Sequence, residues 1–142
     1  MDIDQIRQEL ASHSGTRLLE AHGDTFAVYD PRGDLPPERQ MPWATIVTSD
    51  TYDAASNLDR PGVFRLNIGL PRTRFRELVN PAEEYDATAV DALFPHPVYA
   101  RQNWVGVLNP QQSWPFVREL LDEAYTFAVR KYDNTEQRRT QV

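Results

Sequence analysis

The chain has 142 residues, 40% of them hydrophobic and 25% charged, which is ordinary for one globular domain with its own hydrophobic core. It has no cysteine, which excludes disulfides, thiolate metal sites and cysteine nucleophiles. The net charge of −6 argues against nucleic-acid binding, which depends on cations that neutralise phosphates. We find no signal-peptide pattern and no apolar run long enough to span a bilayer, so we expect a cytoplasmic protein that does not bind membranes.

The first half of the chain predicts one helix followed by four strands. Apolar residues at helical spacing behind an Asp2–Gln5 capping box predict a helix over 3–12. Short apolar and β-branched runs separated by turn residues predict strands at 16–20, 25–29, 43–48 and 63–68. The last of these alternates strictly, so its apolar residues share one face while Arg65 and Asn67 project from the other.

The second half predicts short elements and then a long helix. Residues 72–79 predict a short helix, 88–94 one or two helical turns, and 103–108 a fifth strand. Pro95-His96-Pro97 is not expected in regular structure. An apolar stripe of Val117, Leu120, Leu121, Ala124 and Ala128 predicts the final helix.

These elements predict a single α+β domain over 1–132, with a polar, frayed tail at 133–142. Short turns between consecutive strands favour an antiparallel sheet of about five strands over a doubly wound fold. We expect the N- and C-terminal helices side by side on one face of this sheet.

The chain resembles two known families, one over nearly its whole length and one over its last third. The segments Phe26–Pro31, Met41–Asp50, Ser56–Asn67 and His96–Tyr99 together resemble a family of actinobacterial proteins of unknown function, over nearly the whole chain. More distantly, the last third resembles the MmcQ/YjbR-like proteins, through His96-Pro97-Val98-Tyr99, the Trp104 strand and the final helix. The second resemblance implies a frataxin-like sandwich, in which two helices cover one sheet face and leave the other partly open.

The sequence shows no motif for a metal, a cofactor or a nucleophile. The histidines His13, His22 and His96 are not at metal-ligand spacing, and no glycine-rich phosphate loop or nucleophile elbow occurs. We therefore predict no metal site and no cofactor. The polar and aromatic residues that remain as candidate ligand-binding residues are Arg65, Asn67, His96, Tyr99, Trp104 and Arg60.

Each candidate also has a structural interpretation. Arg65 is expected either to meet a planar anion or to pair with a nearby carboxylate, and His96 either to face a ligand or to hydrogen-bond within its loop. Arg60 belongs either to a turn or to a ligand-binding site. The sequence does not decide which face of the sheet carries Trp104. If Arg65 and His96 bind a ligand, replacing either with alanine removes binding and shifts the melting temperature by only a few degrees.

Two hypotheses about function follow. The first is a small binding or accessory domain whose open sheet face takes a small organic molecule or a protein partner. The second is an enzyme acting on a small organic substrate, such as a secondary metabolite, through His96 with Arg65. A concave cavity containing both residues favours the enzyme, and a flat face favours the binding domain. The absence of a recognisable nucleophile or cofactor motif favours the binding domain. The oligomeric state stays open.

Overall fold

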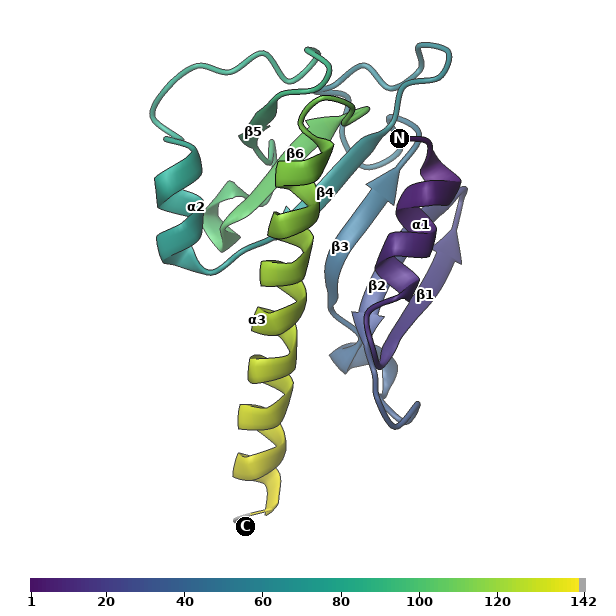
Figure 1. Ribbon diagram of the computed structural model, residues 1–142, viewed down its shortest axis with the longest axis vertical. Helices are drawn as coiled ribbons and strands as arrows, with labels where there is room; N and C mark the ends of the chain where they lie inside the picture. The colour runs from purple at the N-terminus through teal and green to yellow at the C-terminus, as the bar shows by residue number, and fades with distance from the viewer. Residues whose placement is uncertain (141–142) are drawn as a thin grey trace.

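The computed structural model describes residues 1–140, which form an antiparallel sheet with helices on one face. The sheet has six strands in the order β1-β2-β3-β4-β6-β5, and every neighbouring pair is antiparallel (Figure 1). The strands are β1 (Thr16–Ala21), β2 (Asp24–Tyr29), β3 (Pro42–Val47), β4 (Arg65–Gly69), β5 (Leu93–Pro95) and β6 (Trp104–Leu108). The helices are α1 (Ile3–Ala11), α2 (Arg72–Leu78) and α3 (Trp114–Thr140), with short 3-10 turns at Pro37–Arg39 and Ala100–Gln102.

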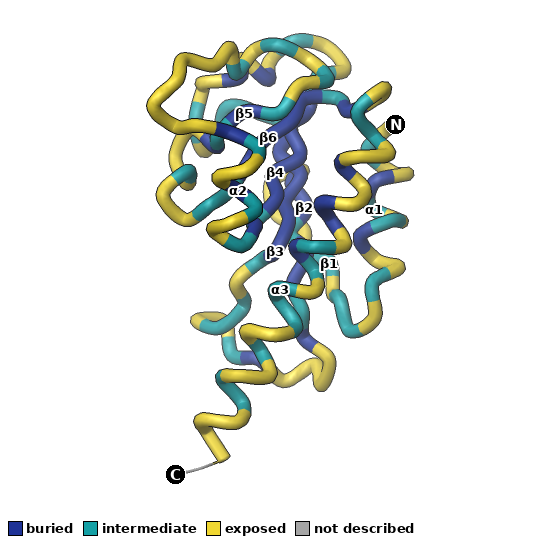
Figure 2. Tube along the Cα trace, turned by 60° about the vertical axis from the view of Figure 1, so that its left-hand side comes forward, coloured by how far each residue is buried: buried dark blue, intermediate teal, exposed yellow. Residues whose placement is uncertain are grey.

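The predicted α+β architecture is confirmed, with α1 and α3 on the same face of the sheet. The capping box at the start of α1 is formed by Asp2 and Gln5. Figure 2 shows the buried residues concentrated in the central strands and in the parts of the helices that cover them. This core is mostly aliphatic, with Ile6 and Leu10 from α1, Leu120 and Leu121 from α3, and apolar side chains from β2, β3, β4 and β6.

The sheet has one strand more than the predicted five. The extra strand is β5, within a segment for which the sequence predicts helical turns over 88–94. That prediction is wrong, and Pro95 lies in regular structure after all, paired with Val105. Because β5 is three residues long and lies at the sheet edge, its pattern is too short to read, and a proline there breaks no ladder on a second side.

The final helix is longer than predicted. Residues 133–140, expected to belong to a frayed tail, continue α3, which extends beyond the end of the sheet in Figure 1. Tertiary contacts hold this extension, because Glu136 accepts a hydrogen bond from Arg39 at 3.0 Å and the Tyr132 ring packs edge-on against Tyr29. Residues 141 and 142 of the predicted tail lie outside the described residues. None of the described helices is long and apolar enough to cross a membrane.

Candidate functional site

The sheet face opposite α1 and α3 carries a row of side chains that crosses four strands. The strand register places Phe26 of β2 opposite Thr45 of β3, Thr45 opposite Asn67 of β4, and Asn67 opposite Gly106 of β6. Because side chains alternate along each strand, all four positions share one face, the face that the alternation at 63–68 assigns to Arg65 and Asn67. Both side chains are buried rather than solvent-exposed.

The loop over residues 48–62 covers one end of this face. Leu58 packs against Val47, Phe94 and Leu108, which form a small second core on this side of the sheet. The loop is also held by an ion pair, in which the two Arg65 terminal nitrogens bind the two Asp53 carboxylate oxygens at 3.0 and 2.6 Å. The loop therefore forms a wall of the site instead of leaving an open sheet.

Arg65 uses most of its donors within the protein. Besides Asp53, it donates to Ser56 Oγ at 3.1 Å and, through Nε, to the Asn67 side-chain oxygen at 2.9 Å. The Asn67 amide then donates to Thr45 Oγ1 at 3.0 Å. The Arg65 guanidinium beside Asp53 also lowers the pKa of that carboxyl, mainly through their hydrogen bonds. Of the two interpretations of Arg65, the geometry favours the carboxylate pair.

Gly106 makes room for this arrangement. A Cβ at position 106 would lie 2.9 Å from the Phe94 ring and 3.3 Å from Cδ of Arg65. Any larger residue at position 106 would displace the aliphatic part of Arg65 or the Phe94 ring, because both side chains are buried and closely packed there.

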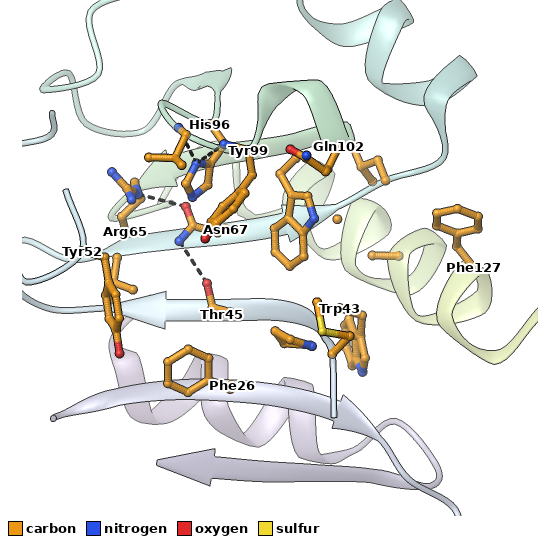
Figure 3. A pocket seen from close by; sticks show the side chains of 18 of the residues that line it. Phe26, Trp43, Thr45, Tyr52, Arg65, Asn67, His96, Tyr99, Gln102 and Phe127 are labelled. Carbon is orange, nitrogen blue, oxygen red and sulfur yellow. Dashed lines mark hydrogen bonds between the residues drawn. The ribbon is translucent and has the colours of Figure 1, made fainter. Parts of the chain in front are cut away.

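His96 is fixed by hydrogen bonds at the inner side of the site, beside Asn67 (Figure 3). Its Nδ1 accepts hydrogen bonds from the backbone N–H groups of Val98 and Tyr99, both at 3.0 Å. Nδ1 is thus unprotonated, and Nε2 carries the hydrogen of the neutral ring. Burial, with a contribution from the Arg65 charge, lowers the pKa of His96 to about 4. Within residues 1–140, Nε2 makes no hydrogen bond, so it is available as a donor.

These side chains enclose a cavity of about 660 Å³, a size typical of sites for small organic molecules. Figure 3 shows aromatic side chains around it, from Phe26 and Tyr52 on one side to Phe127 of α3 on the other. Its lining comprises Phe26, Met41, Pro42, Trp43, Thr45, Val47, Tyr52, Asp53, Arg65, Asn67, Gly69, Leu70, His96, Val98, Tyr99, Gln102, Trp104, Ala124, Phe127 and Lys131.

The rim of this cavity is unusually apolar. Seven large hydrophobic side chains are exposed within residues 1–140, and four of them line the cavity: Met41, Tyr52, Val98 and Tyr99. Apolar side chains clustered around a concavity mark a binding surface more strongly than scattered ones do. The cavity therefore combines an apolar rim with a polar floor of Thr45 and Asn67.

Trp104 lies on the cavity side, which answers the question left open by the sequence. Its indole packs directly over Gly69, the residue opposite it on β4. A Cβ at position 69 would lie only 2.8 Å from Cε2 of the indole. The glycine therefore lets the ring lie flat over the strand, where it forms part of the cavity lining.

Five of the six candidate residues line this single cavity: Arg65, Asn67, His96, Tyr99 and Trp104. The sixth, Arg60, lies outside its lining. Arg60 donates hydrogen bonds to the backbone oxygens of Ser56, Asn57 and Thr88, and so ties the 48–62 loop to the segment between α2 and β5. The structure thus gives Arg60 a loop-stabilising position.

Sequence reasoning missed several lining residues. Phe26 and Thr45 could have been found only from the strand register, which the sequence does not specify. Asp53, Tyr52 and Phe127 are brought in by a loop and by the far part of α3. One signal was present for Lys131, because it is the only lysine in the chain.

A trio of possible metal ligands lies elsewhere, on the helix side. Within residues 1–140, ligand atoms of Glu9, His13 and Asp122 fall within 4.8 Å of one another. The His13 nitrogens already contact oxygens, the Glu9 carbonyl at 2.9 Å and the Asp122 carboxylate at 2.8 Å. The Glu9 carboxylate pairs with Arg118. These contacts join α1 to α3, and they leave no ring nitrogen of His13 free for a metal.

The geometry bears on both hypotheses about function. A concavity containing both Arg65 and His96 is present, which is the feature expected of the enzyme. The hydrogen bonds point the other way, because the Arg65 charge is neutralised by Asp53 and the Nδ1 lone pair of His96 is occupied. A neutral histidine with a pKa of about 4 is a hydrogen-bond donor at neutral pH, and it is poorly suited to proton transfer there.

Comparison with protein families places the chain in one of them. Residues 1–138 match a family of unknown function, DUF6194, and the chain belongs to this family. No curated protein and no solved structure matches the chain. The resemblance to MmcQ/YjbR-like proteins and the actinobacterial origin stay predictions, and the activity has to be inferred from the cavity.

Proposed function

We propose that this DUF6194 member is a binding domain for a small, largely apolar organic molecule that enters the cavity on the sheet face opposite α1 and α3. The observation that carries this proposal is the clustering of Met41, Tyr52, Val98 and Tyr99 around a cavity of about 660 Å³. Exposing these side chains to water is unfavourable, and a ligand that covers them recovers part of that free energy. Aromatic walls favour a flat ligand, since rings stack on rings.

The polar floor supports an orientation for the ligand. The Nε2 hydrogen of His96 is a donor without a protein partner in residues 1–140, and it lies next to the Asn67–Thr45 pair. A carbonyl or hydroxyl oxygen of the ligand would accept from it. The charge of Arg65 is already compensated, so this end suits a neutral polar group better than an anion.

The same features support binding over catalysis. Of the groups named in the enzyme hypothesis, the Nδ1 lone pair of His96 already accepts two hydrogen bonds, and the charge of Arg65 is already paired with Asp53. We also expect a cytoplasmic protein. A protein partner that covers the rim of the cavity is the alternative to a small molecule. A small molecule is preferred because the concavity has the volume of one.

A matched pair of valines tests this proposal. Val98 and Val90 are both 54% exposed, but only Val98 lines the cavity. The probe is N-phenylnaphthylamine, an uncharged aromatic dye whose fluorescence rises in apolar surroundings, titrated into the folded protein. We expect saturable binding, weakened at least about tenfold by Val98→Asp, because a carboxylate at an apolar rim must be desolvated.

The control variant Val90→Asp should bind the dye within a factor of about two of the parent. Energy transfer from tryptophan to the bound dye provides a second readout, because Trp43 and Trp104 both line the cavity. Binding that is not saturable, or that both variants weaken equally, would contradict the proposal.

A further inference from the structure

The cavity contains the only lysine of the chain. Of the fifteen basic residues fourteen are arginines, and the remaining one, Lys131, lines the cavity near the middle of α3. Its Nζ lies 4.3 Å from the centroid of the Phe127 ring, a cation–π contact that places the ammonium at the Phe127 end of the site. Figure 3 shows Phe127 across the cavity from Arg65 and His96.

Within residues 1–140, no carboxylate forms an ion pair with this ammonium. The residues one helical turn away are Phe127, Ala128, Asn134 and Thr135, none of which is charged. Within residues 1–140, Lys131 forms no ion pair, whereas Arg39 and Arg139, near the same part of α3, both pair with Glu136. Lys131 is thus a cation held against an aromatic ring, with no counter-ion from the described part of the chain.

The other charges of the cavity do not compensate for it. The lining contains two cationic side chains, Arg65 and Lys131, and one carboxylate, Asp53. Because Asp53 binds both terminal nitrogens of Arg65, its charge is used at the opposite end. The Phe127 end of the cavity is therefore electropositive, in a protein whose net charge is −6.

We propose that the ligand is an amphipathic organic acid, with a flat apolar body between the aromatic walls and an anionic group paired with Lys131. This inference rests on the proposed function. It assigns the anion to the Lys131 end, and not to Arg65, because Asp53 pairs with Arg65 while no carboxylate within residues 1–140 pairs with Lys131. An ammonium is a compact donor with three hydrogens, so it can bind a carboxylate, sulfonate or phosphate group that approaches from different directions.

Two dyes with the same ring system test the charge of the ligand separately from its apolar body. Anilinonaphthalene sulfonate carries a sulfonate, whereas N-phenylnaphthylamine is the same pair of rings without it. We expect Lys131→Met to weaken sulfonate binding about fivefold, the size of a partly exposed ion pair, and to leave the neutral dye unchanged. Lys131→Arg keeps the charge and should restore most of the sulfonate affinity.

The matched control is Arg130→Met. Arg130 also lies over the Phe127 ring, at 5.4 Å, but it does not line the cavity. Its replacement should therefore leave both dyes unaffected. Added salt should weaken the sulfonate dye and not the neutral one, because screening acts only on the charged pair.

The outcomes separate the two proposals. One outcome would contradict the proposal of an acidic ligand but not the proposal of a binding cavity. In that outcome the neutral dye binds saturably, and Lys131→Met and Arg130→Met change the affinity for the sulfonate dye equally. An unchanged sulfonate affinity in Lys131→Met would do the same. Failure of the neutral dye to bind, with the sulfonate dye bound independently of Val98, would overturn the proposed function itself.

Discussion

Both faces of the sheet carry buried side chains, but different interactions hold them together. Under α1 and α3, strand residues such as Ala44, Ile46, Leu66 and Ile68 are apolar and fully buried. On the cavity face Arg65 is 1% exposed, yet it is charged and fully engaged with Asp53, Ser56 and Asn67. Apolar burial stabilises in proportion to area, whereas a buried ion pair mainly penalises the loss of either partner.

This difference teaches where stability and specificity lie. The helix-covered face contributes most of the free energy of folding. A substitution that changes the size or shape of a side chain there disturbs close packing and lowers stability. The cavity face contributes a fixed arrangement of donors and aromatic rings, whose single members cannot be removed independently. Substitutions on both faces and at the cap of α3 test this division, and we take them from the largest expected effect to the smallest.

The largest effect is expected from Leu120→Ala on the helix-covered face. Leu120 is fully buried between α3 and the sheet, so its loss removes apolar contacts and leaves a void. We expect the free energy of unfolding, measured by urea denaturation, to fall by about 4 kcal/mol. Affinity for N-phenylnaphthylamine should change little well below the melting temperature. A loss below about 1 kcal/mol would show that this face is not the main source of stability.

A somewhat smaller loss is expected from Asp53→Asn on the cavity face. The substitution keeps the shape of the side chain but leaves the Arg65 charge buried without its counter-ion, at a cost of about 3 kcal/mol. The double variant Asp53→Leu with Arg65→Met should recover most of this loss in the same urea titration, since no unpaired charge remains. A double variant as unstable as the single one would show that the cavity face depends on packing and not on charge pairing.

The burial of Arg65 also reverses one expectation from the sequence. Arg65→Ala was expected to shift the melting temperature by only a few degrees, which holds for an exposed side chain that binds a ligand. Arg65 is 1% exposed, and its loss would leave the partly buried Asp53 carboxylate without its partner, so we now expect a clear loss of stability.

His96 gives the cavity face a pH dependence. Its pKa is lowered from 6.5 to about 4 in the folded protein, so on acidification the unfolded chain takes up a proton first. The contribution to stability is therefore fully present above pH 6.5 and is lost as the pH falls towards 4. We expect this loss to reach roughly 2–3 kcal/mol.

The control for this pH dependence is His96→Asn. The asparagine oxygen can accept from the same two backbone N–H groups as Nδ1 does, but it does not titrate. Urea denaturation of both proteins between pH 7 and about 4 should show the additional loss only in the parent. Parallel pH profiles would mean that His96 is protonated as readily in the folded as in the unfolded protein.

The smallest effect is expected from Asp91→Asn, in the segment before β5, whose carboxylate binds the residues just before α3. The Asp91 carboxylate accepts from the backbone N–H groups of Gln111, Gln112 and Ser113 and from Ser113 Oγ, and these bonds hold its pKa well below the usual range. Asparagine tolerates the left-handed backbone at position 91 and keeps an acceptor oxygen, so the cost should be about 1 kcal/mol at pH 7.

The lowered pKa of Asp91 predicts how the stability lost in Asp91→Asn changes with pH. A lowered pKa contributes stability that is present above the unfolded value of 3.8 and is lost as the pH falls below it. The difference between the parent and Asp91→Asn in thermal or urea unfolding should therefore shrink as the pH falls below 3.8. A difference that grows on acidification would contradict the charge-based account of this cap.

The sequence by itself determined the class of fold, one face of the sheet and most of the candidate residues. Periodicity is a local property, so the α1 helix, the stripe of α3 and the alternation around Arg65 and Asn67 are all readable without a structure. The same alternation places Arg65 and Asn67 together opposite Leu66 and Ile68. It cannot show what covers them.

Only the tertiary structure decided how the second face is used. The partner of Arg65 comes from a loop whose path no periodicity encodes, and β5 is too short for a pattern. The face that carries Trp104 depends on its pairing with Gly69, a long-range register. Lys131 joins the cavity because α3 continues past the sheet, held by contacts with residues about a hundred positions away, such as Arg39 with Glu136. Contacts between distant segments are set by packing and hydrogen bonding of the whole fold, and they turn a set of polar residues into a site.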